Sequence, residues 1–178
     1  MSKNKEFDAV IQKTAKVNVI INAAINGLVP ILAMGSMIYV PVMGLGGMVQ
    51  DLVLMNFFLI FFVFFFARLE CINYAKKNGI PGIAYDQQTH ASLTKYLQRS
   101  TFKNFVVMYV KYMVTWALPV VLLCLAIYPE AGVPLADFVF IKTTFSVFLA
   151  NRVAMLGGQL GAIDQDSIKL VKAKMAKA

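Results

Sequence analysis

Four long apolar stretches, separated by polar segments, dominate the pattern of the chain. A helix needs about 20 residues to cross the roughly 30 Å of membrane hydrocarbon, and the second stretch, which is the shortest, relies on its flanks. The four stretches are about Val17–Val40, Leu52–Ala67, Asn104–Tyr128 and Phe138–Leu156. We therefore predict an all-α, polytopic membrane protein with four transmembrane helices in a single membrane domain, 1–178.

The polar segments between these stretches differ in their content of Lys and Arg. Three contain at least four Lys or Arg residues each, and two contain neither residue. The basic segments are 1–16, 68–103 and 157–178, and the other two are Pro41–Gln50 and Pro129–Ala136. Because cytoplasmic loops carry an excess of Lys and Arg, we predict an inner-membrane protein with both termini and the long loop in the cytoplasm. The spans then form two hairpins, 17–67 and 104–156.

Two of the basic segments contain apolar residues at helical spacing. In the long loop, Leu93, Tyr96 and Leu97 share one side of a short segment, which predicts a helix lying in the lipid interface. In the N-terminal segment, Phe7 and Ile11 recur at the same spacing among Lys residues. This second pattern fits either an interfacial helix or a disordered tail.

The two hairpins resemble each other in sequence. Pro30 in the first span precedes Tyr39 by the same offset as Pro119 in the third span precedes Tyr128. Asp residues also open the second and fourth spans. The similarity predicts two tandem related helical hairpins, and its alternative is chance likeness between apolar segments of biased composition.

Composition excludes a soluble domain and narrows the partners. The chain is 59% hydrophobic and 15% charged, against about 25% charged residues in soluble proteins. A net charge of +8 in a soluble protein would suggest nucleic acid, but these charges flank membrane spans. We expect the lipid bilayer and anionic lipid head groups on the cytoplasmic side as partners, and no nucleic acid. The sequence contains no motif for catalysis, a cofactor or a metal ion, so we expect no enzymatic activity.

Two lysines, Lys111 and Lys142, lie deep inside apolar stretches. A charge at membrane depth costs about 2.5–3.5 kcal/mol unless it is compensated. Each ammonium group either extends to the interface, lines a substrate or ion pathway, or forms a structural ion pair. Asp51 and Asp137 are the expected ion-pair partners across the bundle.

Uncharged polar residues accompany the lysines. Asn22 with Asn26, and Lys111 with Thr115, are spaced to share one face of their helices. In each case a proline four residues later leaves the carbonyl of Asn26 or Thr115 without its helical donor, so this face is expected to turn inward. The alternative is ordinary hydrogen bonding between helices. The candidate pathway residues are Asn22, Asn26, Lys111 and Thr115 on the inner half, and Asn56, Lys142 and Ser146 on the outer half.

These residues lead to two functional hypotheses. The first is a small oligomeric channel or transporter for an anionic or neutral polar solute, formed as a homo-oligomer because four helices offer little interior. Two lysines without an acidic residue at mid-membrane favour an anion over a cation. The second is a non-transporting accessory or assembly subunit that binds other membrane helices, for which Gly157 and Gly161 provide a small-residue face.

The order of polar residues also resembles a group of known proteins. Asn22, Ala23 and Asn26 in the first span, an Asp at the start of the second, and Phe138 four residues before Lys142 are similar to small bacterial four-span membrane proteins of no established function. The resemblance implies the four-span fold and adds no chemistry.

Overall fold

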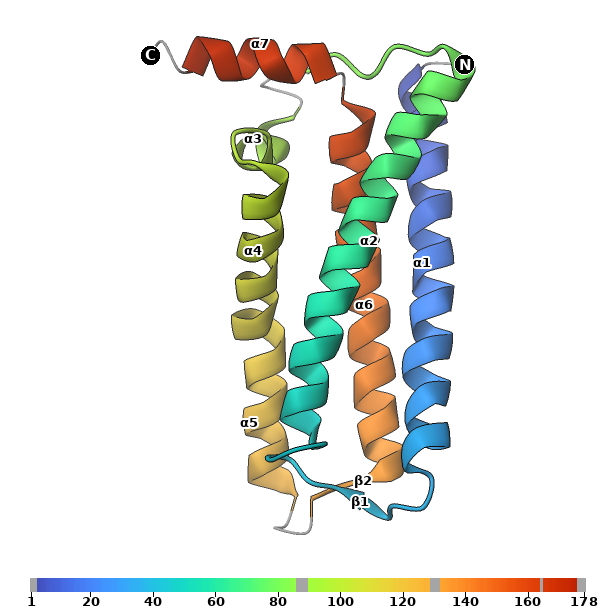
Figure 1. Ribbon diagram of the computed structural model, residues 1–178, viewed down its shortest axis with the longest axis vertical. Coiled ribbons are helices and arrows are strands. Elements are labelled where there is room, and N and C mark those ends of the chain that lie inside the picture. The colour runs from blue at the N-terminus through green and yellow to red at the C-terminus, as the bar shows by residue number, and fades with distance from the viewer. Residues whose placement is uncertain (1–2, 86–89, 129–131, 164, 176–178) are drawn as a thin grey trace.

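A computed structural model describes residues 3–85, 90–128, 132–163 and 165–175. Four helical segments run alongside one another, and three of them are single helices (Figure 1). The single helices are α1 (Lys3–Met34), α2 (Met48–Asn78) and α6 (Leu135–Ala162). The third segment consists of α4 (Thr101–Tyr112), a π-helical turn (Met113–Ala117) and α5 (Leu118–Ile127), and we refer to it as the third span.

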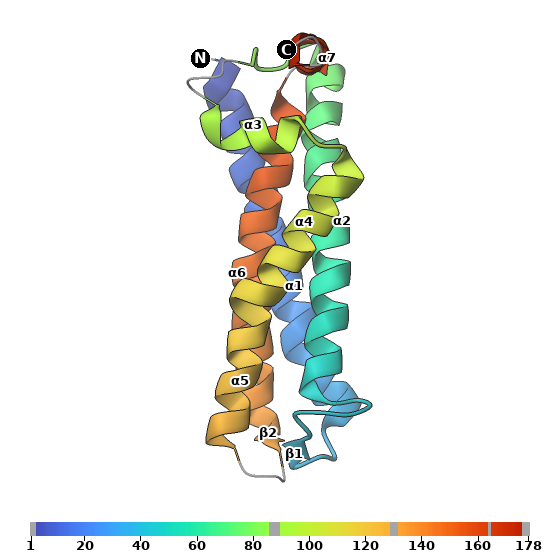
Figure 2. The same ribbon diagram turned by 90° about the vertical axis from the view of Figure 1, so that its left-hand side faces the viewer.

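Short elements lie across the two ends of this bundle (Figures 1 and 2). α3 (Ala91–Leu97) and α7 (Gln165–Met175) lie at the same end of the bundle as the start of α1, and we call this the basic end. At the other end β1 (Tyr39–Val40) pairs antiparallel with β2 (Val133–Pro134), and we call this the ribbon end. Gly132 has a φ of +105° next to this ribbon, where an added Cβ would lie 2.3 Å from the Val40 carbonyl oxygen.

The prediction of an all-α protein with four long apolar helices is confirmed. Helices in 5–34, 48–78, 101–127 and 135–162 are each long and apolar enough to cross a membrane. They extend beyond the apolar stretches because polar residues at the helix ends also have helical backbone. Residues 157–162, predicted to begin a cytoplasmic tail, complete α6, and α7 follows them.

The N-terminal segment is neither an interfacial helix nor a disordered tail. Residues 3–16 continue directly into the first span as one helix, α1. Phe7 is fully buried and Ile11 is nearly so, and the Phe7 ring lies 6.0 Å from the ring of Tyr74 in α2. In the long loop, α3 buries Leu93 and Leu97 where a short helix is predicted, while residues 86–89 lie outside the described part.

α6 is the central helix of the bundle. It packs against α1 along one side and against α2 along another, whereas the third span packs mainly on α2 (Figures 1 and 2). Glycines allow the close approach, because an added Cβ at Gly157 or Gly161 would lie 2.6 or 2.3 Å from a backbone oxygen of α2. Gly158 faces Ile11 of α1 in the same way, with 3.0 Å to its side chain. The small-residue face predicted at Gly157 and Gly161 therefore forms the α2–α6 contact.

The two proline-containing spans differ in structure. Pro30 lies within α1, which continues as an α-helix to Met34. Pro119 follows a π-helical turn, and the Thr115 hydroxyl donates to the Lys111 carbonyl at 2.8 Å. The first helix of each hairpin packs on the second helix of the other hairpin: α1 packs on α6, and the third span packs on α2. A duplicated hairpin is expected to pack in this way. Because α1 is a continuous α-helix and the third span contains a π-helical turn, the duplication stays a prediction.

Substituting Gly161 with Ala tests the close contact between α2 and α6. We expect a loss of about 1–3 kcal/mol in the free energy of unfolding, because the new methyl group would meet the Arg68 carbonyl oxygen and force the helices apart. Gly27→Ala is the matched control, since its Cβ would lie 3.4 Å from the Thr143 hydroxyl at ordinary contact distance. Unfolding of the purified variants in detergent measures both. A Gly161→Ala protein as stable as the control would contradict this packing.

Candidate functional site

A groove with a volume near 540 Å³ lies between α1 and α2, and most of its lining residues are apolar. Asparagines of α1 lie along one wall and phenylalanines of α2 along the other, and an acid and a base lie at the end near the ribbon. The asparagines are Asn18, Asn22 and Asn26, the phenylalanines are Phe58, Phe62 and Phe66, and the charged residues are Asp51 and Lys142. We call this the asparagine groove.

The three asparagines form a regular series along α1. Each side-chain Nδ2 donates to the backbone carbonyl four residues earlier, at 2.9, 2.9 and 3.0 Å for Asn18, Asn22 and Asn26. These bonds fix the amide groups on the helix surface and use one of the two N–H donors of each amide. The Oδ1 atoms are then the groups that the asparagines can offer as hydrogen-bond acceptors to a molecule in the groove. Asn18 lies four residues before Asn22, so it extends the predicted Asn22–Asn26 pair to a series of three. This spacing is visible in the sequence.

An ion pair closes the end of the asparagine groove near the ribbon. Lys142 Nζ lies 2.7 Å from Asp51 Oδ1, with side chains 9% and 24% exposed. The ammonium also lies 5.8 Å from the centroid of the Phe138 ring, on the preceding turn of α6. Lys142 therefore forms an ion pair with one of its two expected partners.

The ion pair leaves hydrogen-bonding capacity unused. Asp51 Oδ2 is buried and has no hydrogen-bond partner. An ammonium carries three donors, of which Asp51 Oδ1 takes one. The groove therefore offers both an anionic acceptor and cationic donors at one end, at roughly 10 Å from the start of α6 by helical rise.

Ser146 joins α6 to α1 beside the groove. It is fully buried, and its Oγ lies 2.9 Å from the Thr143 carbonyl and 3.4 Å from the Asn22 carbonyl. Four of the predicted pathway residues thus come together where α1 meets α6. Two are predicted for the inner half of the membrane, Asn22 and Asn26, and two for the outer half, Lys142 and Ser146.

The other predicted pathway residues lie elsewhere. Lys111 and Thr115 are exposed on the outer face of the third span, and the Lys111 ammonium lies 5.6 Å from the ring of Tyr112. They do not meet Asn22 and Asn26 within one chain, because the third span packs on α2 and not on α1. Asn56 is fully buried, its amide atoms have no hydrogen-bond partner, and it lines neither large groove.

Asp137, the second expected ion-pair partner, has a different role. It accepts a hydrogen bond of 3.0 Å from the Tyr128 hydroxyl at the exposed ribbon end. This bond stabilises the protonated phenol and raises the pKa of Tyr128, and the nearby carboxylate charge acts in the same direction. Among the described residues, the partner of Lys142 is Asp51 alone.

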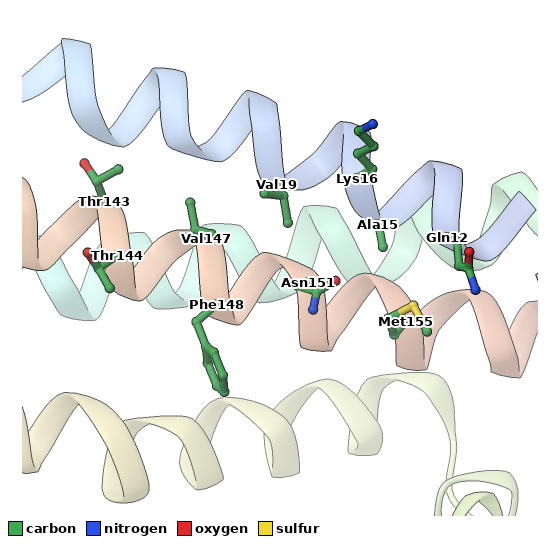
Figure 3. Close-up of a pocket in the computed structure, with 10 residues that line it drawn as sticks. All are labelled: Gln12, Ala15, Lys16, Val19, Thr143, Thr144, Val147, Phe148, Asn151 and Met155. Atoms are coloured by element: carbon green, nitrogen blue, oxygen red, sulfur yellow. The ribbon is translucent and has the colours of Figure 1, made fainter. Parts of the chain in front are cut away.

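A second groove lies between α1 and α6, and its volume is near 700 Å³ (Figure 3). Its polar lining comes from both helices and consists of Gln12, Lys16, Thr143, Thr144 and Asn151. In Figure 3 Val147 points toward α1, whereas Phe148 points toward the third span. The Phe148 ring meets Trp116 of that span, with the ring centroids 4.4 Å apart. The exposed Thr144 and Asn151 place polar groups at membrane depth on this face.

In the described part of the chain, no group of three His, Cys, Asp or Glu side chains is placed to hold a metal ion. Cys71 and Cys124 are buried as free thiols.

The fold and its grooves define a multi-pass α-helical membrane protein with four candidate spans. Comparisons with protein-family models, curated proteins and solved structures find no match to the chain. The functional argument therefore depends on the geometry of the grooves.

Removing one member of the ion pair tests its place in the structure. We expect Lys142→Met to lower the free energy of unfolding by about 3 kcal/mol, because it leaves a mostly buried carboxylate without its counter-charge. Adding Asp51→Leu is expected to restore most of the loss, since an apolar pair of similar volume replaces the charges. Lys111→Met, at an exposed lysine, is the control and should change stability by less than about 0.5 kcal/mol. Strictly additive effects in the double-mutant cycle would show that the two residues do not interact.

Proposed function

We propose that the protein is a small transporter or channel for a neutral or zwitterionic polar solute, and that the asparagine groove is its solute-binding site. The observation that carries this proposal is the Lys142–Asp51 pair at the end of a groove lined by amide oxygens. The groove volume falls within the roughly 300–1,000 Å³ typical of small-molecule sites. Its groups are suited to binding and passage of a solute and not to catalysis.

The ion pair changes the expected charge of the solute. An unpaired Lys142 would favour an anion, but Asp51 lies 2.7 Å away and cancels its charge. The remaining carboxylate oxygen and the ammonium donors fit a molecule with both a donor and an acceptor, such as a small polyol or an amino acid. The Phe58, Phe62 and Phe66 wall supports the apolar part of such a molecule.

The proposal also assigns an orientation and an assembly. We place the basic end in the cytoplasm, because Lys and Arg are concentrated in the segments at that end. The asparagine groove then holds its charged pair in the outer half of the membrane and extends toward the inner half through Asn22 and Asn18. Lys111 and Thr115, exposed at membrane depth on the third span, are placed against a second copy of the chain.

The same exposed residues support a second candidate function. Lys111 and Thr115 are exposed polar residues within an apolar helical surface that a soluble partner cannot reach in the membrane. A polar side chain on the membrane helix of another protein would satisfy it. An accessory or assembly subunit is therefore the alternative, and a membrane protein that co-purifies in fixed stoichiometry would favour it.

Flux through the purified protein tests the transport proposal. In proteoliposomes we expect uptake of glycerol or glycine above that of protein-free vesicles, and little conductance of chloride. Asn22→Leu should reduce uptake at least about tenfold, because it removes an acceptor from the groove and adds an apolar side chain. Asp51→Asn should reduce uptake as well, since it removes the anionic acceptor.

The controls separate function from folding. Lys77→Gln, at an exposed lysine on the last turn of α2, leaves the asparagine groove and the proposed contact with a second copy intact and should keep wild-type uptake. Circular dichroism and gel filtration of each variant establish that it is folded before its flux is compared. A folded wild-type protein without uptake of either probe, or an Asn22→Leu variant with unchanged uptake, would contradict the proposal.

A further inference from the structure

A small pocket of about 40 Å³ lies at the basic end, where α2 and α6 meet the start of α4 and the helix α7. Two arginines line it and no acidic residue does. Its lining residues are Arg68, Tyr96, Leu97, Arg99, Thr101, Asn104, Leu160 and Ile168. This pocket is separate from both grooves.

Arg68 has no acidic partner among the described residues. Its Nη1 donates to the Thr101 hydroxyl, whereas its Nε is buried and has no hydrogen-bond partner. The ion pairs in the described part of the chain are Lys142–Asp51 and Lys169–Asp166, so no described carboxylate pairs with Arg68. A partly buried guanidinium without a counter-charge is costly, and an anionic ligand would compensate it.

The backbone adds positive potential at the same place. α4 begins at Thr101, and Ser100 caps it by accepting a 3.2 Å hydrogen bond from the Lys103 amide. The N-terminus of a helix carries a partial positive charge and favours anions such as phosphate. Arg99, immediately before the cap, contributes a second guanidinium to the pocket lining.

Asn104 supplies an independent indication of a ligand. Its side chain is buried, with the residue only 3% exposed, and its Nδ2 donates to the Tyr96 carbonyl at 2.7 Å. That bond fixes the orientation of the amide. The Oδ1 atom is left buried without a donor, in a residue that lines the pocket. A ligand that fills this pocket therefore needs an anionic group for the arginines and a hydroxyl donor for Asn104.

The depth of the pocket matches the head-group layer. Arg68 lies about 30 Å along α2 from Met48 at about 1.5 Å per residue. This distance equals the thickness of the hydrocarbon core, so the arginine lies where the polar head groups begin.

We propose that this pocket binds a glycerophosphate group. Arg68 and Arg99 donate to the phosphate oxygens, and a glycerol hydroxyl donates to Asn104 Oδ1. The pocket is small, so it admits the polar tip of the ligand and the remainder extends from its mouth. The group comes either from the head group of phosphatidylglycerol or from soluble glycerol phosphate, which share this chemistry.

Thermal unfolding of the full chain in detergent tests the site. Phosphatidylglycerol, phosphatidylcholine and glycerol 3-phosphate are titrated separately. We expect phosphatidylglycerol to raise the unfolding temperature and phosphatidylcholine, which has no hydroxyl donor and no net charge, to raise it less. Arg68→Gln and Arg99→Gln should each weaken the response to phosphatidylglycerol at least about tenfold in half-saturating concentration.

Matched variants make the result specific. Lys77→Gln removes an exposed cation on the last turn of α2, outside the pocket, and should respond as the wild type does. Arg68→Lys keeps the charge but loses the planar fork, so its affinity should fall between those of the wild type and Arg68→Gln. If Arg68→Gln does not fold, Arg99→Gln and Arg68→Lys still test the site.

The three titrations also identify the source of the ligand. Stabilisation by glycerol 3-phosphate as well as by the lipid supports a site for the phosphate group itself, and stabilisation by the lipid alone supports a head-group site. Equal stabilisation by phosphatidylglycerol and phosphatidylcholine, or arginine variants that respond like the wild type, would overturn the proposal.

Discussion

Lipid offers no partner to a charge or to a hydrogen-bonding group, and this constraint explains why α6 lies at the centre of the bundle. Its Lys142 must find a counter-charge within the protein, and Asp51 at the start of α2 supplies it at 2.7 Å. Its glycines allow α2 to approach until backbone meets backbone at Gly161. The ion pair near the ribbon end and the glycine contact near the basic end therefore hold the same two helices at both ends.

The same packing produces the grooves. Because α1 follows α6 closely and contacts α2 much less, space remains between α1 and α2, and the amides of α1 line it. The third span packs on α2 and leaves further space along α6 toward α1 (Figures 1 and 3). Polar residues in the spans thus lie in a groove, as Asn22 does, on an outer surface, as Lys111 does, or in the core, as Asn56 does. In the described part of the chain, Arg68 likewise has no carboxylate as partner.

The sequence is sufficient to predict the spans and part of the packing. Apolar length alone locates the four helices, and the spacing of Gly157 and Gly161 indicates a close contact. It does not predict which of two aspartates pairs with Lys142, since Asp51 and Asp137 both begin a span at similar depth. Nor does periodicity reveal which neighbour a helical face meets, so the stripe of Lys111 and Thr115 was expected to turn inward and is exposed. The ion-pair partner and the exposed face depend on how each helix is rotated about its axis and on which helices are neighbours, and only the three-dimensional structure specifies both.

The central claim is that the asparagine groove forms a hydrated binding surface within the membrane, and accessibility to a charged thiol reagent tests it most directly. Cys71 and Cys124 are buried, so a single introduced cysteine dominates the labelling. The account predicts that Asn22→Cys reacts at least about tenfold faster than Ile20→Cys, because a thiolate forms in water and not in lipid. Ile20 is 58% exposed on α1, lies two residues from Asn22 and lines neither groove, so it is the reference at matched depth. Equal, slow labelling at both positions would contradict the account.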